Sequence, residues 1–402
     1  MSPIKTAPAA LRADDERLRA RYVEEVLALL YPGTGERQVE YLVVPNARRP
    51  RLLVPADDRR VAAAAVRRYA EPQSRLARLK RDTVVAALRT GLSGLLLRDR
   101  LRVRAAEDTI DAYLGRTLGT ELRLSVHIGP ARANRKPVLQ LLDSAGRTLA
   151  FAKLGTSALT RALVRAEANA LAAVGEAGLT SVRVPEVLHA GRWGEHEVLV
   201  QSALPVWRPR SALTAPRLAG AMLEVARCCG TSHGALDGSG YWTRLGARLA
   251  AIADHAEGAA LRTAAERIAR AAGRVELSFG SWHGDWAPWN MASLADAVLV
   301  WDWERFTPGV PIGFDALHHA LQVGIGHSPS AGQAVNELVA AAPGLLLPFG
   351  VVHRQAVEVT ALLYLIDLAT RYVTDRQAEA GARLGVLGSW LLPVLVARVE
   401  AL

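Results

Sequence analysis

The order of secondary-structure signals constrains the fold of this chain more than any other feature. Residues 120–205 predict three strands, a helix and two further strands: Glu121–Ile128, Pro137–Leu142, Thr148–Leu154, then Thr160–Val174, then Val187–Ala190 and Glu197–Gln201. From Pro205 onward the pattern is mostly helical, with one compact non-helical stretch at Phe279–Gly313. We expect an α+β chain, and we expect its chemistry in that stretch because loops held by a rigid scaffold often carry function.

The remaining elements follow from apolar periodicity. In residues 1–116 we predict a helix, a hairpin of two strands and three more helices: Tyr22–Leu30, Tyr41–Val44 with Arg51–Val54, Val61–Tyr69 capped by Asp57 or Asp58, Ser74–Leu88 and Glu107–Leu118. In the second half we predict the helices Ala215–Cys229, Tyr241–His255, Ala259–Ala272, Ala331–Val339, Val352–Thr374 and Gln377–Val399. The expected domains are an α/β cap of unknown role (1–116), a strand-rich lobe (117–205) and a helical lobe (206–402).

Composition places the chain among soluble globular proteins. Its 402 residues are 50% hydrophobic and 22% charged, enough to build the cores of two or three domains. The only cysteines, Cys228 and Cys229, are adjacent and form no disulfide framework, which favours a cytoplasmic location. The N-terminus has no apolar signal region, and the apolar stretch Leu384–Val396 is shorter than the ~20 residues of a membrane span. We expect no membrane insertion.

The net charge of +10 is concentrated in the first half of the chain. Residues 1–205 hold 33 basic and 22 acidic residues, whereas residues 206–402 hold 16 and 17. A basic half could attract nucleic acid, anionic lipid or a phosphorylated ligand. A solvated arginine-rich surface also accounts for it, and the lack of long basic runs or interleaved aromatics favours that interpretation. We expect no nucleic-acid partner.

Chemistry-bearing side chains gather in the non-helical stretch. It reads Ser281-Trp-His-Gly-Asp-Trp-Ala-Pro-Trp-Asn290 and, seven residues on, Val298-Leu-Val-Trp-Asp-Trp-Glu304. Phosphoryl transfer needs a carboxylate to orient a hydroxyl, hard oxygen ligands for Mg²⁺ and a cation beside the phosphates. Asp285 and Asn290 lie on one irregular loop, and the apolar strand Ala297–Trp301 ends at Asp302. The spacing therefore allows a base and two metal ligands to converge.

One lysine is the candidate for the cation. The chain has only four lysines, and Lys153 lies inside the apolar strand Leu149-Ala-Phe-Ala-Lys-Leu. A charge there is costly unless it has a partner, and the following helix offers Glu167 or Glu176. The alternative is an edge-strand lysine whose ammonium group reaches water.

These motifs resemble those of the aminoglycoside phosphotransferase and choline kinase-like family, relatives of protein kinases, over roughly residues 120–345. His283-Gly284-Asp285 and Asp302-Trp303-Glu304 replace the protein-kinase His-Arg-Asp and Asp-Phe-Gly, and no Ala-Pro-Glu segment follows. The resemblance implies a bilobal protein-kinase-like fold with Mg²⁺ and ATP or GTP between the lobes. It implies the following roles: Asp285 as base, Asn290 and Asp302 on Mg²⁺, His283 as a brace, and Lys153 paired with Glu167 on the phosphates.

The resemblance implies further roles that rest on weaker signals. The turn Gly129–Pro137 has one glycine and is either a phosphate loop, through Gly129, Arg132 and Asn134, or a plain basic hairpin. Gln201 and Ala203 fall at the expected adenine-binding hinge. Asp315 is a structural aspartate, a helix N-cap or both. Trp286, Trp289 and Glu304 are candidates for an acceptor pocket, and we interpret His318 and His319 as core or surface residues without a metal role.

We therefore predict a small-molecule kinase that phosphorylates a hydroxyl of a sugar, an antibiotic or an amino alcohol. Residues 206–282, where the acceptor is expected, hold 10 basic and 6 acidic residues, which favours a neutral or anionic acceptor over a polycation. Two alternatives from other classes are a nucleotide-binding regulator without catalysis and a basic nucleic-acid-binding protein.

Overall fold

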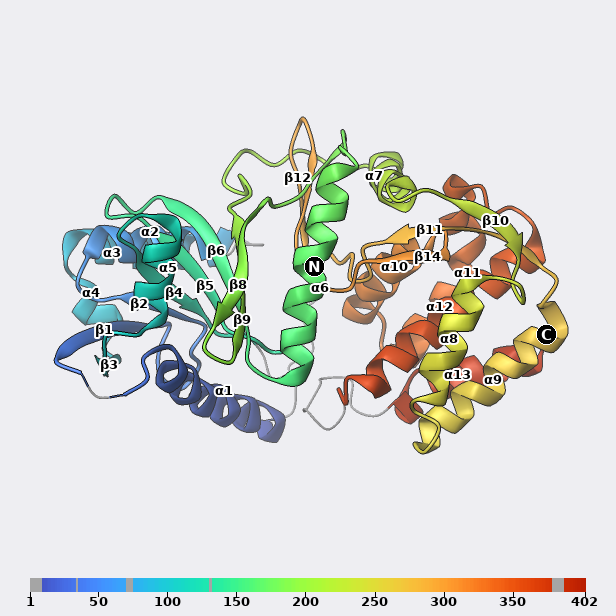
Figure 1. The fold of residues 1–402 in the computed structure, drawn as a ribbon, viewed down its shortest axis with the longest axis horizontal. Coiled ribbons are helices and arrows are strands. Elements are labelled where there is room, and N and C mark those ends of the chain that lie inside the picture. The colour runs from blue at the N-terminus through green and yellow to red at the C-terminus, as the bar shows by residue number, and fades with distance from the viewer. Residues whose placement is uncertain (1–8, 34, 70–74, 130–131, 378–386) are drawn as a thin grey trace. The chain divides into compact units, whose positions relative to one another are not determined.

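The structure is a computed structural model, and it describes residues 9–33, 35–69, 75–129, 132–377 and 387–402 (Figure 1). The fold is mixed α+β. The chain divides into two compact units. The first comprises residues 1–165 and 187–203, and the second comprises residues 166–186 and 204–402.

The first unit is built on one eight-stranded antiparallel sheet. Its strand order is β3-β1-β2-β4-β5-β6-β9-β8. The strands are β1 (Arg37–Val44), β2 (Leu52–Pro55), β3 (Arg100–Ala105), β4 (Arg123–His127), β5 (Val138–Leu142), β6 (Thr148–Gly155), β8 (Val187–Trp193) and β9 (His196–Ser202). Strand β2 pairs with β4 through Leu53 and Val126. The hairpin of the first 116 residues is therefore continuous with the strands of residues 117–205.

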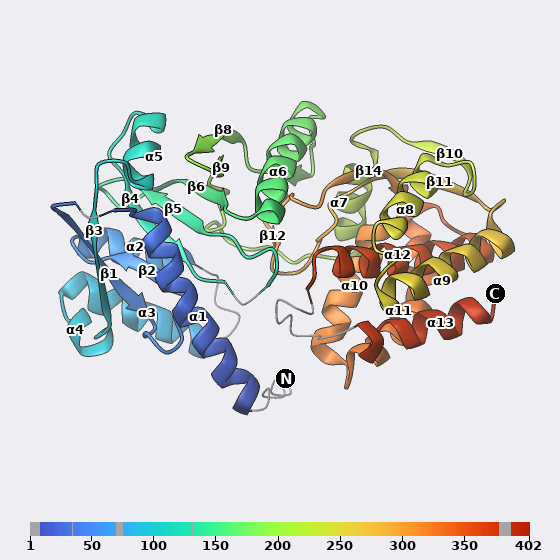
Figure 2. The same cartoon turned by 60° about the horizontal axis from the view of Figure 1, so that its bottom comes forward.

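Helices cover both faces of this sheet because successive residues of its strands are apolar and point to opposite faces. Tyr41 and Val43 pack with α1 (Ala9–Leu30) and α5 (Ile110–Leu118), whereas Leu42 packs with α2 (Arg59–Tyr69) and α3 (Arg75–Thr90) (Figure 2). A short helix, α4 (Ser93–Leu96), follows α3. Asp58 caps α2, since its Oδ1 accepts hydrogen bonds from the amides of Arg60 and Val61 at 2.7 and 3.1 Å.

The second unit is mostly helical and contains two small sheets. Its helices are α7 (Ala215–Arg227), α8 (Gly240–Ala250), α9 (Ala256–Ala272), α10 (Phe314–His327), α11 (Ala331–Leu346), α12 (Arg354–Thr374) and α13 (Leu392–Glu400), with 3₁₀ turns η1 (Leu347–Phe349) and η2 (Leu387–Ser389). One sheet has the order β10-β11-β14 (Ser232–Ala235, Glu276–Trp282, Thr307–Pro311), and the other has the order β12-β13-β7 (Met291–Ser293, Val298–Val300, Val182–Arg183). Helix α6 (Ala158–Glu176) begins in the first unit and ends in the second.

Helix α12 forms the centre of the second core. Its residues from Val359 to Thr370 are all buried, because α9, α11 and α13 pack around it. Within the described residues, no single helix is long and apolar enough to cross a membrane. The segment formed by α11 and η1 is long and apolar enough only when it is taken together with α12, and the two are bent by 110° relative to each other.

Most predicted helices and strands are present within a few residues of their expected bounds. One prediction is wrong: Gln377–Val399 is not one helix, since η2 and a turn at residues 390–391 precede α13. Residues 378–386 of that range, and Ser74 of another predicted helix, lie outside the described residues. Six strands were not predicted: β3, β7, β10, β11, β12 and β14. Strand β3 carries arginine at alternate positions, β7 and β10 are short, and β11, β12 and β14 fall wholly or partly in the stretch predicted only as non-helical.

Candidate active site

The predicted catalytic loop connects two strands of the second unit. Residues 283–290 follow β11 and lead into β12, and the Asn290 amide closes a turn by donating to the Ala287 carbonyl at 2.9 Å. Gly284 has φ +83°, and a Cβ there would approach the Arg305 carbonyl oxygen to 2.4 Å. Only glycine fits this position, because a side chain would be strained at this φ and would collide with the backbone of Arg305.

Asp315 fixes this backbone from the first turn of α10. Its Oδ2 accepts from the His283 amide at 2.7 Å, and its Oδ1 accepts from the Gly284 amide at 3.1 Å. The N-cap of α10 is Gly313, with φ 103°, so the N-cap interpretation of Asp315 is wrong. Burial raises the pKa of Asp315 to about 7, although the two amides act in the opposite direction.

His283 connects the loop with the strand that carries Asp302. Its Nδ1 accepts from the Asp285 amide at 3.1 Å, and its Nε2 therefore donates to the Trp301 carbonyl, 3.2 Å away. The ring is fully buried and lies edge-on to Trp303, with 4.6 Å between the ring centroids. Burial lowers the pKa of His283 to about 4, so the ring is neutral at neutral pH.

Both carboxylate oxygens of Asp285 are held by side chains. Oδ2 accepts from Asn290 Nδ2 at 2.9 Å, and the same nitrogen donates to the Asp285 carbonyl at 3.0 Å. Oδ1 lies 3.1 Å from Nε2 of His318, a fully buried histidine of α10. Nδ1 of His318 lies 3.1 Å from the hydroxyl of Tyr364, on α12. A chain of contacts thus runs from the core helix to the loop.

The charge state of Asp285 determines the direction of these bonds. Burial raises the pKa of this carboxyl, but the hydrogen bond from His318 and the positive charge of Arg371 outweigh it and leave the pKa below its ordinary value. An ionised carboxylate only accepts, so His318 donates from Nε2 and accepts the Tyr364 hydroxyl at Nδ1. Burial also lowers the pKa of His318, which fits a neutral ring with one donor.

Sequence reasoning missed two residues that contact this loop. His318 lies three positions after Asp315, on the same face of α10, and this spacing could have indicated that both reach the loop. Arg371 donates from Nη1 to the Gly284 carbonyl at 2.6 Å across a separation of 87 residues. No local pattern indicates that second contact.

Three carboxylates gather beside the loop. Glu167, Asp302 and Glu304 each offer an oxygen, and these oxygens all lie within 4.8 Å of one another. Asp302 has φ 72°, the left-handed region, at the bend after β13, and Glu167 Oε1 accepts from the Trp303 amide at 3.3 Å. Carboxylate oxygens are the ligands that Mg²⁺ and Ca²⁺ prefer, so this donor set fits a hard divalent cation.

Asn290 adds an amide oxygen to this inventory. Its Nδ2 makes both contacts with Asp285, which leaves Oδ1 as the acceptor atom of the side chain. The Asn290 carbonyl accepts from the Trp301 amide at 3.0 Å, so β12 and β13 bring the backbones of Asn290 and the residue before Asp302 together. The metal roles of Asn290 and Asp302 stay predictions.

The residues predicted to bind nucleotide belong mostly to the first unit. Lys153 lies on β6 between Val138 and Leu199 and is 6% exposed. Gln201, on β9, is equally buried, and Ala203 follows that strand. In the predicted phosphate loop, Gly129, Arg132 and Asn134 are described, whereas residues 130–131 lie outside the described residues. Glu167 falls in the second unit, so its pairing with Lys153 stays a prediction.

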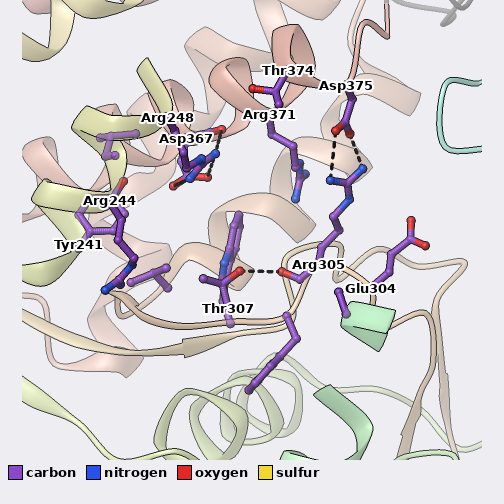
Figure 3. A pocket seen from close by; sticks show the side chains of 15 residues that line it. Tyr241, Arg244, Arg248, Glu304, Arg305, Thr307, Asp367, Arg371, Thr374 and Asp375 are labelled. Atoms are coloured by element: carbon purple, nitrogen blue, oxygen red, sulfur yellow. Dashed lines mark hydrogen bonds and ion pairs between the residues drawn. The ribbon is translucent and has the colours of Figure 1, made fainter. Parts of the chain in front are cut away.

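The candidates for an acceptor pocket separate by burial. Trp286 is fully buried and donates from Nε1 to the sulfur of Met291 at 3.3 Å, so its ring is packed in the core and presents no face to a ligand. Trp289 is 46% exposed. Glu304 is buried and lines a pocket of about 340 Å³ in the second unit (Figure 3). We therefore retain Trp289 and Glu304 as candidates.

No protein-family model and no curated protein matches the sequence. Solved structures of small-molecule kinases do match. A thermostable mutant of aminoglycoside phosphotransferase APH(4)-Ia with ADP and hygromycin B is 13% identical, covers 73% of this chain and 98% of its own, and has a TM-score of 0.45. For choline kinase LicA from Streptococcus pneumoniae these values are 12%, 66%, 90% and 0.42. For spectinomycin phosphotransferase APH(9)-Ia with ADP and spectinomycin they are 10%, 71%, 95% and 0.41.

Proposed function

We propose that this chain is a phosphotransferase that moves the γ-phosphoryl group of ATP or GTP to a hydroxyl of a small molecule. The observation that carries the proposal is the arrangement around Asp285. An ionised carboxylate is oriented by Asn290 and His318 on a loop whose amides are tied down by Asp315, and a cluster of three carboxylates lies beside that loop. Phosphoryl transfer needs this combination of an oriented base and hard oxygen ligands.

Asp285 acts on the acceptor hydroxyl. Its carboxylate accepts a hydrogen bond from that hydroxyl and holds the oxygen in line with the γ-phosphorus. The bond from phosphorus to the bridging oxygen breaks while the bond to the acceptor oxygen forms, and a nucleoside diphosphate leaves. The acceptor's proton passes to Asp285. Because the pKa of Asp285 is low, the carboxylate is a weak base, and its main contribution is orientation.

The carboxylate cluster would hold the metal. We propose that Asp302 and Asn290 are ligands of Mg²⁺, with Glu167 or Glu304 as further oxygen donors. When bound, Mg²⁺ would neutralise part of the negative charge of the phosphates. The bend at Asp302 turns its carboxylate toward the cluster, and the Trp303 amide fixes one oxygen of Glu167. Lys153 is proposed to add a positive charge at the phosphates.

The test is a turnover screen of the full chain with Mg²⁺–ATP and Mg²⁺–GTP against neutral sugars, sugar acids, amino alcohols and antibiotics. We expect one class to stimulate nucleotide consumption, and we expect EDTA to abolish it. Asp285→Asn should reduce turnover by about 100-fold or more while nucleotide affinity is retained. Asp296→Asn, which changes an exposed carboxylate of the same segment, is the matched control and should leave both unchanged.

Two results would contradict this assignment. Lost nucleotide binding with partial turnover in Asp285→Asn would mean that the roles are misassigned. Tight nucleotide binding without turnover on any acceptor would favour the non-catalytic regulator.

A further inference from the structure

The pocket of about 340 Å³ in the second unit contains an excess of positive charge. It is lined by α8, the end of β11, the loop at residues 304–307 and the C-terminal half of α12 (Figure 3). Its lining includes four arginines and three acids: Arg244, Arg248, Arg305, Arg371, Glu304, Asp367 and Asp375. The volume is in the range of small-molecule sites.

Two of the four arginines are neutralised within the pocket. Arg248 donates to both carboxylate oxygens of Asp367, at 2.9 and 3.1 Å. Arg305 makes the same two-pronged contact with Asp375. Bidentate pairs of this kind satisfy both partners, so these four side chains form the walls of the pocket and leave no net charge.

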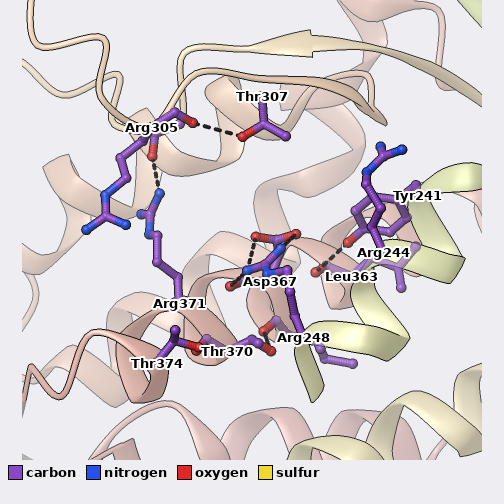
Figure 4. A network of polar contacts seen from close by, with 12 residues as sticks. Tyr241, Arg244, Arg248, Arg305, Thr307, Leu363, Asp367, Thr370, Arg371 and Thr374 are labelled. Carbon is purple, nitrogen blue, oxygen red and sulfur yellow. Dashed lines mark hydrogen bonds and ion pairs between the residues drawn. The ribbon is translucent and has the colours of Figure 1, made fainter. Parts of the chain in front are cut away.

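The other two arginines bond only to uncharged carbonyl groups. Arg371 donates from Nη1 to Gly284, and Arg244 donates from Nη2 to Pro308 and Gly309 at 3.2 and 2.7 Å. Figure 4 shows both side chains together with the Arg248–Asp367 pair. Among the described residues, neither makes an ion pair with a carboxylate. Each guanidinium has five N–H donors, so both keep donors for a ligand.

The two arginines that make no direct ion pair differ in their surroundings. Burial lowers the pKa of Arg371 and the neighbouring charge of Arg305 lowers it further, whereas the carboxylates of Asp285, Asp367 and Asp375 act in the opposite direction. Asp367 and Asp375 are already paired with Arg248 and Arg305, so they offset the charge of Arg371 only in part. Arg244 is exposed at the opposite wall, on α8. A negatively charged group in the pocket would therefore be attracted from two sides.

The hydroxyl groups of the pocket complement the arginines. Thr307 Oγ1 donates to the Arg305 carbonyl at 3.1 Å, and Thr374 Oγ1 donates to the Thr370 carbonyl at 2.8 Å. A threonine hydroxyl has one proton, so both oxygens are left with lone pairs only. They can accept hydrogen bonds from the hydroxyls of a ligand. The apolar rings of Trp282 and Phe306 also line the pocket and could cover the face of a small ring.

We propose that this pocket binds the phosphate acceptor and that the acceptor carries an anionic group, carboxylate or phosphate, which Arg371 and Arg244 hold. This inference rests on the proposed function. Arg371 contacts the carbonyl of the residue before Asp285, so an anion at Arg371 lies next to the catalytic loop. The substrate class is a polyhydroxylated anion, such as a sugar acid or a sugar phosphate.

The test measures binding without nucleotide, by isothermal titration calorimetry on the full chain. The probes are D-gluconate and D-glucose 6-phosphate, which distinguish the two anionic groups, and D-glucose as the uncharged control. We expect at least one anion to bind and glucose to bind at least about tenfold more weakly. Arg244→Gln should weaken the anion about tenfold or more. Arg262→Gln, the same charge change at an exposed position of α9, should not. Arg244→Lys should bind the anion more tightly than Arg244→Gln and less tightly than the wild type, since lysine keeps the positive charge but lacks the paired N–H donors of a guanidinium group.

The outcomes separate this inference from the proposed function. Anion binding that depends on Arg244, without turnover on any acceptor, would support the pocket and remove the kinase assignment. Turnover on a cationic or neutral acceptor that is unchanged in Arg244→Gln would overturn the pocket and keep the kinase assignment. Equal weakening in Arg244→Gln and Arg262→Gln would mean diffuse surface attraction and would also overturn the pocket.

Discussion

The buried, neutral His283 makes the stability of the second unit depend on pH. Its pKa falls from 6.5 in the unfolded chain to about 4 in the folded protein. Between these values the unfolded state binds a proton that the folded state does not. The contribution of His283 to the free energy of unfolding is therefore fully present above pH 6.5 and is lost as the pH falls toward 4. This pKa difference corresponds to about 3 kcal/mol.

His283→Asn removes the titrating group while its amide oxygen can still accept from the Asp285 amide. It loses the donor to Trp301, so we expect it to be less stable than the wild type at pH 7, by about 1–3 kcal/mol. This difference in the free energy of unfolding should shrink by about 3 kcal/mol between pH 7 and pH 4. The reason is that protonation of residue 283 stabilises the unfolded state of the wild type but not that of the variant. In acid the variant should match or exceed the wild type.

The assay is urea unfolding in EDTA at several pH values, followed by tryptophan fluorescence. Eight of the nine tryptophans lie in the second unit, so the signal reports the unit that contains His283. His327→Asn, which changes an exposed histidine at the C-terminal end of α10, is the control and should follow the wild type at every pH. A difference between His283→Asn and the wild type that stays constant from pH 7 to pH 4 would refute the argument.

Two further predictions concern activity under the proposed function. His318→Phe removes the hydrogen-bond donor to Asp285 and raises the pKa of that carboxyl. We expect kcat to fall by about 10- to 150-fold, the equivalent of about 1.5–3 kcal/mol. The acid limb of the pH–rate profile should move to higher pH. A pH profile of unchanged shape would show that His318 has only a packing role. Lys153→Ala should weaken nucleotide binding and slow turnover, as measured by calorimetry and steady-state kinetics, and unchanged values would make this lysine structural.

The parts of the site that sequence could predict lie close together in the chain. Asp285, Asn290 and Asp302 fall within one stretch of 18 residues, and the turn chemistry around Gly284 and the apolar strand before Asp302 fix their relative positions. Spacing and residue type were sufficient to place Asp285 and Asn290 on one loop and Asp302 at the end of the next strand, because these contacts are local, and the catalytic and metal roles stay predictions.

The supporting contacts could not be predicted in the same way, because they come from distant helices. Arg371 reaches the loop from α12, 87 residues after Gly284, and Tyr364 of the same helix acts on the loop only through His318. Apolar periodicity indicates that α12 is buried but does not identify its neighbours. His318 was set aside because adjacent histidines suggested no metal site, although its spacing from Asp315 placed both on one face. The pairing of β2 with β4 likewise has no local signal.

That pairing has a consequence for attempts to isolate the second half of the chain. A chain shortened to residues 117–402 would leave β4 as an open sheet edge, because the backbone groups of β4 that pair with β2 would lose their partners. The apolar side chains of Leu124 and Val126 would also lose part of their cover. Such edges attract other strands. We expect the shortened chain to self-associate during purification, and a loss of activity in it would then say nothing about a catalytic contribution from the first 116 residues.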